Sequence, residues 1–282
     1  MKRYFVILLT FTFVFPLMGQ KRAFTIDDLY RLKNISEPQF SPDGKKIAFV
    51  ATESFPESGK SNADIFIINA DGGNLLNLTN HPSGDNHPRW SPDGKIIYFV
   101  STRENGPQLW QVNIGNGEIQ KITDFPMGIS DPEWSPDGSS IIFSSDVYPD
   151  CGANVKCNSF NDSTVSNGPL KAHVTDKLLY RHWNFWSDGK YTHLISFNPQ
   201  DKSYKDLTPG EYHSPSWEMG SVGYTFSPDG DEICFVSNRE KYEAETTNKD
   251  LWIIPSRGGE PKNITIDNKA YDGNPLYSPD GK

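Results

Sequence analysis

The sequence has few cysteines and only one long apolar run. Its 282 residues contain three cysteines, Cys151, Cys157 and Cys234. No second cysteine pair lies near the first, and His173 alone does not complete a zinc site, so we expect no metal and no cofactor. The apolar run Tyr4–Met18 is shorter than the ~20 residues of a membrane-spanning helix, and no later run is long enough to span.

The apolar run has the features of a secretory signal peptide. Lys2 and Arg3 precede it, and the small and polar pair Gly19-Gln20 follows. We therefore expect residues 1–20 to be a signal peptide and residues 21–282 to be periplasmic or secreted; an uncleaved anchor is the alternative. In an oxidising compartment, the short spacing of Cys151 and Cys157 predicts a disulfide, and Cys234 is expected to be a buried free thiol.

Basic residues are also scarce. The chain has 27 Lys and Arg against 36 Asp and Glu, and its formal net charge is −9. Nucleic acids and anionic membranes are bound by basic patches, so we expect neither as a partner.

The motif Ser-Pro-Asp-Gly occurs five times, and strand-like segments follow the first four copies. A period near 45 residues with four short strands per repeat is typical of a β-propeller. We therefore predict an all-β fold, a partial β-propeller with WD40-like repeats. The copies of the motif begin at Ser41, Ser91, Ser135, Ser227 and Ser278. We expect four blades of four strands each, followed by the start of a fifth blade. The four blades span about 37–79, 86–123, 130–208 and 222–265.

The motif itself predicts a tight turn between the first two strands of each blade. Proline presets φ, aspartate hydrogen-bonds to the local backbone, and glycine adopts the left-handed conformation that ends the turn. The repeated aspartates are therefore expected to shape turns rather than to catalyse a reaction.

The third and fourth copies are unusually far apart. We interpret residues 147–190 as an insertion between strands two and three of the third blade, because the strand-like "YTHLISFN" follows them; a degenerate blade is the alternative. An arc of four blades leaves two open edges, so we expect residues 21–282 to be an incomplete N-terminal propeller domain of a longer protein.

Three segments resemble one family of serine peptidases. The repeat "SPDGKIIYFVS" resembles that of TolB-like proteins and of the prolyl oligopeptidase (S9) family. The opening "FTIDDLYRLKNISEPQFSPDG", the segment "YRHWNFWSDGKY" and the phrase "SNREKYEAETTNKDLWIIP" are similar to the dipeptidyl-peptidase 5 and acylaminoacyl-peptidase branch. The resemblance implies an exported serine exopeptidase that cleaves short peptides from the N-terminus of oligopeptides, its propeller gating access to a C-terminal α/β-hydrolase domain.

The chain departs from this family in one respect. It contains no G-x-S-x-G nucleophile motif, so the hydrolase domain and its catalytic triad are absent, no catalytic residue is carried over, and we expect this chain alone to be inactive. The alternative function is that of a non-enzymatic TolB-like periplasmic propeller that binds a protein partner. A homodimer is left open.

The insertion supplies the candidate substrate-binding residues, Arg181, His182, Trp183 and Trp186. The planar guanidinium of an arginine suits a carboxylate or carbonyl group, and tryptophans pack against apolar peptide side chains. The competing interpretation is that these residues pack the insertion against its own blade. Asp85, Asp131 and Asp272, which recur before the inner strands, form either an acidic rim or hydrogen bonds that hold their own loops.

Overall fold

The computed structural model describes residues 22–104, 106–169, 172–176, 178, 180–217 and 222–281. The predicted signal peptide, residues 1–20, lies outside these ranges. In the part of the chain that is described, no helix has the length and apolar character needed to cross a membrane. A short helix, α1 (Ile26–Arg31), precedes the first strand.

Four antiparallel sheets of four strands each make up the body of the protein. Each sheet follows chain order, so every strand pairs with the one before it. The prediction of an all-β partial propeller is confirmed. The strands are β1 (Asn34–Phe40), β2 (Lys46–Phe55), β3 (Lys60–Asn69) and β4 (Leu76–Asn77) in the first sheet; β5 (Asp85–Trp90), β6 (Ile96–Ser101), β7 (Gln108–Asn113) and β8 (Ile119–Lys121) in the second; β9 (Ser130–Trp134), β10 (Ile141–Val147), β13 (Tyr191–Asn198) and β14 (Ser203–Asp206) in the third; and β15 (Tyr224–Phe226), β16 (Glu232–Ser237), β17 (Asp250–Pro255) and β18 (Lys262–Asn263) in the fourth.

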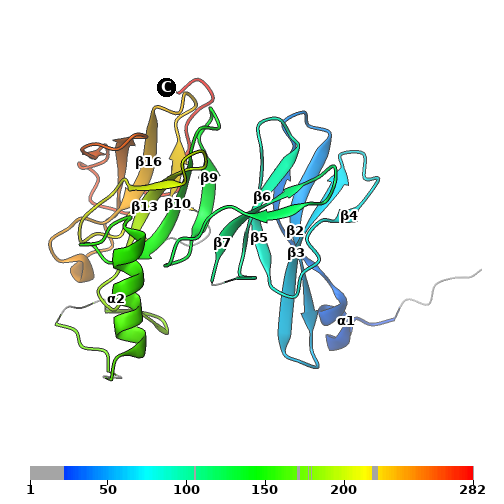
Figure 1. Cartoon of the computed structure of the whole chain (residues 1–282), viewed down its shortest axis with the longest axis horizontal. Coiled ribbons are helices and arrows are strands. Elements are labelled where there is room, and N and C mark those ends of the chain that lie inside the picture. The colour runs from blue at the N-terminus through cyan, green and yellow to red at the C-terminus, as the bar shows by residue number, and fades with distance from the viewer. Residues whose placement is uncertain are drawn as a thin grey trace, which may run out of the picture.

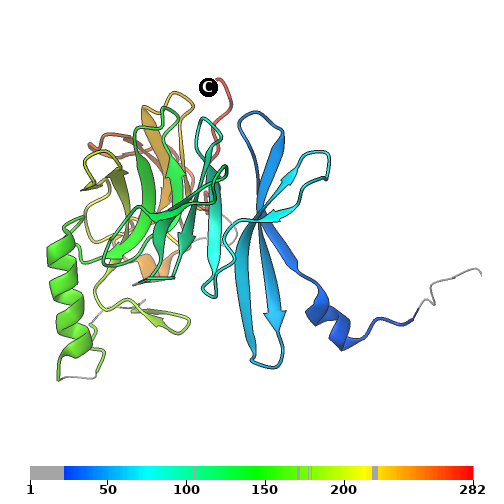
Figure 2. The same ribbon diagram turned by 45° about the vertical axis from the view of Figure 1, so that its right-hand side comes forward.

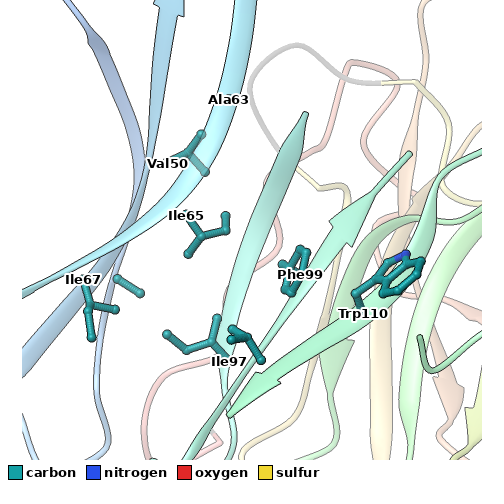
Figure 3. Packing of buried hydrophobic residues seen from close by; sticks show 9 residues of the cluster. Val50, Ala63, Ile65, Ile67, Ile97, Phe99 and Trp110 are labelled. Carbon is teal, nitrogen blue, oxygen red and sulfur yellow. The ribbon is translucent and has the colours of Figure 1, made fainter. Parts of the chain in front are cut away.

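Successive sheets stand beside one another in an open arc (Figures 1 and 2). Alternate apolar residues of each strand face the neighbouring sheet and are removed from water, which is the main favourable contribution to folding. Between the first two sheets, Val50 and Ile65 pack toward Ile97 and Phe99 (Figure 3). Two further clusters join the second sheet to the third and the third to the fourth. The core is therefore a series of layers between blades.

The Ser-Pro-Asp-Gly turns have the geometry that the sequence predicts. In the first, the Ser41 hydroxyl donates to Asp43 at 2.7 Å, and the Lys45 amide donates to the same carboxylate at 3.1 Å. Gly44 has a φ of 68°, a left-handed conformation that glycine adopts at no steric cost. The hydroxyl hydrogen bond lowers the pKa of the Asp43 carboxyl. These aspartates shape turns.

The fifth copy of the motif forms the same turn without a sheet. The Ser278 hydroxyl donates to Asp280 at 2.7 Å, and Gly281 has a φ of 70°. The segment before it, residues 273–277, forms no strand, because no second strand pairs with it among the described residues.

Residues 148–190 leave the third sheet after β10 and return to it at β13, and we call them the arm. The arm contains α2 (Val155–Asn167) and a two-stranded hairpin of β11 (Arg181–His182) and β12 (Phe185–Trp186). The arm projects from one face of the arc, and the Ser-Pro-Asp-Gly turns lie on the opposite face (Figure 1). Both β10 and β13 keep an unbroken register from Ile141–Phe197 to Val147–Tyr191, so the arm does not interrupt the sheet.

Candidate functional site

The innermost strands of the first three sheets share an unusual backbone feature. Glu37, His87 and Asp131 each stand directly before a proline, with φ values of 53°, 55° and 52°. Proline disfavours the right-handed helical region for the residue before it, and a positive φ is uncommon for any residue but glycine. The pairing register breaks beside Glu37 and His87, between Ser36 and Gln39 and between Asn86 and Arg89. Each inner strand is therefore bent at the same place.

These three side chains meet, although they come from three different sheets. The His87 Nδ1 atom lies 3.2 Å from the Glu37 Oε2 atom and 3.4 Å from the Asp131 Oδ1 atom. All three side chains are about 30% exposed. We call them the inter-blade triad. The imidazole of His87 in the second blade thus interacts with a carboxylate of the first blade and with one of the third blade.

The charges of the inter-blade triad support one another. Burial alone would lower the pKa of His87, but the carboxylates of Glu37 and Asp131 raise it above the ordinary value. Burial alone would raise the pKa of Glu37, yet the imidazole lowers it. For Asp131, burial has the larger effect and raises the pKa. A protonated His87 between two carboxylates is therefore the favoured state below neutral pH.

A cavity of about 490 Å³ lies beside the inter-blade triad and is lined by residues of the inner strands β1, β5, β9 and β15. We call it the axial cavity. Burial raises the pKa of Glu133 to about 7, against the opposing influence of Arg89. The fully buried Tyr224 donates its hydroxyl to the Asp131 carbonyl. The cavity thus combines one guanidinium, two carboxyl groups of raised pKa and the indoles of Trp90 and Trp134.

One buried histidine outside the inter-blade triad pairs with a carboxylate, and no metal-binding cluster accompanies it in the described part of the chain. No group of three or more potential ligands that could hold a metal ion is found among the described residues. His193 donates to or accepts from Asp206 at 2.7 Å, as in a catalytic dyad, but its Nε2 atom lies 2.8 Å from the Gly210 carbonyl. Both ring nitrogens are thus engaged, and the imidazole is buried. This pair holds a loop.

The arm brings two of the four candidate substrate residues together. Arg181 and Trp186 are opposite one another in the hairpin, and the guanidinium lies 5.7 Å from the indole centroid. The Trp186 ring also stacks on His173 at 4.1 Å and on Tyr180 at 5.6 Å. The contacts of Trp186 thus lie within the arm rather than against the blade, and the residue remains 41% exposed.

The other two candidates are placed differently. Trp183 lies in the turn between β11 and β12, with a φ of 48° and a side chain 80% exposed. The backbone of His182 pairs with Phe185, but its side chain lies outside the described part of the structure. Trp183 is about twice as exposed as Trp186, at 80% against 41%.

The base of the arm is closed on itself by a disulfide, and Ala153 and Val155 pack it against the core beside the third sheet. Cys151 and Cys157 are joined by a disulfide, with 5.5 Å between their Cα atoms, and Cys234 is a buried free cysteine. The Asn154 side chain caps α2 by accepting from the Cys157 amide. A cavity of about 360 Å³ separates the arm from the loop containing Glu211 and His213. The arm therefore has a fixed base and an open flank.

The three aspartates of the expected acidic rim have different roles. Asp85 is completely buried and receives both hydrogen bonds of an ion pair with Arg103, at 3.0 and 2.8 Å. Asp272 accepts from the Asn268 amide at 2.6 Å. Only Asp131 lines the axial cavity. The three carboxylates do not form a rim.

Sequence analysis missed the inter-blade triad and the axial cavity. The available signal was a residue that stands before a proline and four positions before the motif. Four of the five copies have it, and these residues share a positive φ: Glu37, His87, Asp131 and Asn274. Their residue types differ, so the repeat pattern alone did not single them out.

Comparisons with known proteins agree with this architecture. Residues 30–217 match the family described as TolB beta propeller domain. The chain is 31% identical over 261 residues to dipeptidyl-peptidase 5 of Porphyromonas gingivalis, a match covering 89% of this chain and 36% of that protein. The chain thus spans little more than a third of the length of this relative.

Two solved structures share the fold. The acylaminoacyl peptidase of Pyrococcus horikoshii is similar with a TM-score of 0.58 and 18% identity, over 84% of this chain and 33% of that chain. TolB from Acinetobacter baumannii is similar with a TM-score of 0.51 and 20% identity, over 83% of this chain and 44% of that chain. At these identities the likeness concerns the fold alone.

Proposed function

Because the chain belongs to the TolB-type β-propeller family and is homologous to dipeptidyl-peptidase 5, we propose that it is the substrate-gating propeller part of an exported serine dipeptidyl-peptidase. The observation that carries the proposal is the match to that peptidase over 89% of the chain. The catalytic α/β-hydrolase domain would lie outside residues 1–282, and residues 1–20 would direct export to the periplasm or beyond.

Selection by such a domain is steric. A propeller over a hydrolase site admits narrow, flexible peptides and excludes folded proteins. The arm adds a contact surface on one face, because Trp183 and Phe185 are 80% and 73% exposed there. Exposed aromatic rings at the end of a fixed hairpin suit an apolar peptide side chain, since they lose little conformational freedom on binding.

The second candidate function is a non-enzymatic propeller that binds a protein partner. It is favoured by the family match and by the shared fold with TolB. The two functions are distinguished by the gene beyond Lys282. An α/β-hydrolase pattern with a G-x-S-x-G motif supports the peptidase, whereas further propeller repeats followed by a stop codon support the binding protein.

The peptidase proposal also predicts how a variant behaves in the protein encoded by the complete gene. Trp183→Ala should raise KM for dipeptidyl substrates with apolar side chains severalfold and leave kcat nearly unchanged, because it removes binding without touching the reacting groups. Steady-state kinetics on dipeptidyl-coumarin substrates checks this.

Phe160→Ala is the matched control, since Phe160 is 70% exposed on α2, away from the hairpin. Equal effects of the two variants, or none from Trp183→Ala, would reduce the arm to scaffolding. Absence of any dipeptidyl-peptidase activity in the complete gene product would reject the proposed function itself.

A further inference from the structure

Two arginines occupy the same place in the second and fourth sheets. In each, a phenylalanine of the second strand pairs with a tryptophan of the third: Phe99 with Trp110, and Phe235 with Trp252. A serine ends the second strand, and an arginine follows two residues later, as Arg103 or Arg239. Both guanidinium groups lie over the paired rings.

Arg103 is fully satisfied within its own sheet. Its Nε atom donates to the Ser101 hydroxyl at 2.9 Å, and one terminal nitrogen donates to both oxygens of Asp85. The side chains of Arg103 and Asp85 are 10% and 0% exposed. The charge of this arginine is balanced by a buried carboxylate, as buried charges require.

Arg239 has no such partner. Its one hydrogen bond runs from a terminal nitrogen to the Ser214 hydroxyl at 3.4 Å, and its Nε atom is buried without an acceptor. No carboxylate of the described residues forms an ion pair with it. In the second sheet the guanidinium of Arg103 contacts Asp85, whereas the guanidinium of Arg239 contacts the neutral Ser214. The Ser214 hydroxyl is also hydrogen-bonded to the Ser237 hydroxyl. Burial lowers the pKa of Arg239, which reflects a charge held away from water.

Three aromatic rings hold this guanidinium in one position. Its Cζ atom lies 4.5 Å from the Trp252 centroid, 5.2 Å from that of Tyr212 and 5.6 Å from that of Phe235. Stacking on aromatic faces holds the plane of a guanidinium in one orientation. Tyr212 is 40% exposed, so the ring of aromatics reaches the surface.

The position of Arg239 also points to a ligand. It begins the connection from β16 to β17, and Glu243 of that connection lines the cavity that the arm forms with Glu211 and His213. Arg239 therefore lies on the same face of the arc as the arm.

We propose that Arg239 binds a carboxylate of a short peptide, supplying from the ligand the negative charge that Asp85 supplies to Arg103. The planar fork of the guanidinium matches a carboxylate with two parallel hydrogen bonds, and the flanking rings exclude water from that contact. The carboxylate follows from the guanidinium that lacks an ion-pair partner, and the choice of a peptide as its carrier rests on the proposed function.

The test is a nuclear magnetic resonance titration of the ¹⁵N-labelled chain that follows the Nε–Hε signals of both arginines. The probes are N-acetylglycylglycine, the same compound as its C-terminal amide, and inorganic phosphate. We expect the acid to shift the Arg239 signal with an affinity on the order of 1 mM, the amide to have at most a tenth of that effect, and the Arg103 signal to stay in place. Arg239→Lys, which assigns the signal, should weaken binding about tenfold.

The proposal is overturned if the Arg239 signal does not move, if acid and amide shift it equally, or if only phosphate shifts it. The comparison of the two arginines within one spectrum of the unaltered chain needs no variant to fold. Loss of peptide binding here would leave the proposed peptidase function untouched, and failure of that function would leave this binding measurable.

Discussion

The four sheets and the arm are stabilised in different ways. Each sheet buries aromatic and branched side chains against the next one, and Phe99, Phe143 and Phe235 are completely inaccessible to water. In α2, the one buried residue among those described is Asn158, which hydrogen-bonds to the Tyr148 amide and to the Gly152 and Asn154 carbonyls. The disulfide and these hydrogen bonds thus fix the base of the arm internally, and Ala153 and Val155 pack that base against the core between the second and third sheets.

This difference matches the roles proposed for the two regions. A domain that excludes folded proteins must be rigid, and the packed cores between the blades make it rigid. A recognition element needs exposed apolar rings, which a core would bury. The arm can expose Trp183 and Phe185 because its base, not its tip, is anchored.

The largest expected effect comes from removing a core ring. Phe143→Ala in β10 should lower the free energy of unfolding by about 3–5 kcal/mol, since it removes a buried ring and leaves a cavity beside Phe125 and Tyr204. Phe160→Ala, the same substitution in the arm, should change it by less than about 0.5 kcal/mol. Urea denaturation of both variants measures this contrast, and similar losses would show that α2 belongs to the cooperative core.

A smaller, pH-dependent effect is expected at the axial cavity. The pKa of Glu133 is raised from 4.5 to about 7, so the folded state binds more protons than the unfolded state between these values. Stability therefore falls as pH rises through that window, by about 3 kcal/mol from this group. The raised pKa of His87 acts in the same direction, because its contribution is complete below the unfolded value and is lost as pH rises through the folded one.

Glu133→Gln should remove most of that slope, and the exposed Glu118→Gln should leave it unchanged. Denaturation curves between about pH 5 and pH 8 give the answer. The part of the slope that remains in Glu133→Gln is assigned to His87, and a slope equal to that of the unaltered chain would mean that Glu133 is already ionised at low pH.

The smallest effect on global stability is expected from the disulfide. Replacing both Cys151 and Cys157 with Ala should shorten hydrogen-exchange protection in Val155–Asn167 by about tenfold or more, because closing this short loop is worth about 2 kcal/mol locally. The unfolding midpoint of the sheets should hardly change. If the unfolding midpoint of the sheets falls together with the hydrogen-exchange protection of α2, the arm and the sheets unfold as one cooperative unit.

Local chemistry explains what could be predicted. The turn motif specifies its own geometry, and alternating apolar residues specify strands that bury one face, so the four sheets follow from short segments. The spacing of Cys151 and Cys157 likewise predicted a contact that the structure contains. The roles of the arm residues were left open, because Trp186 and Trp183 are chemically alike and only the fold distinguishes a stacked ring from an exposed one.

The sequence by itself determined the repeat, its turns and the layered sheets, because these depend on neighbours within a few residues or on the regular alternation of a strand. Only the tertiary structure decided which charged groups meet. His87 reaches Glu37 and Asp131 because three inner strands bend at the same place, and Arg239 lacks the carboxylate that Arg103 has because Ser214 stands beside it. Such contacts depend on distances between residues far apart in the chain, which only the packed sheets establish.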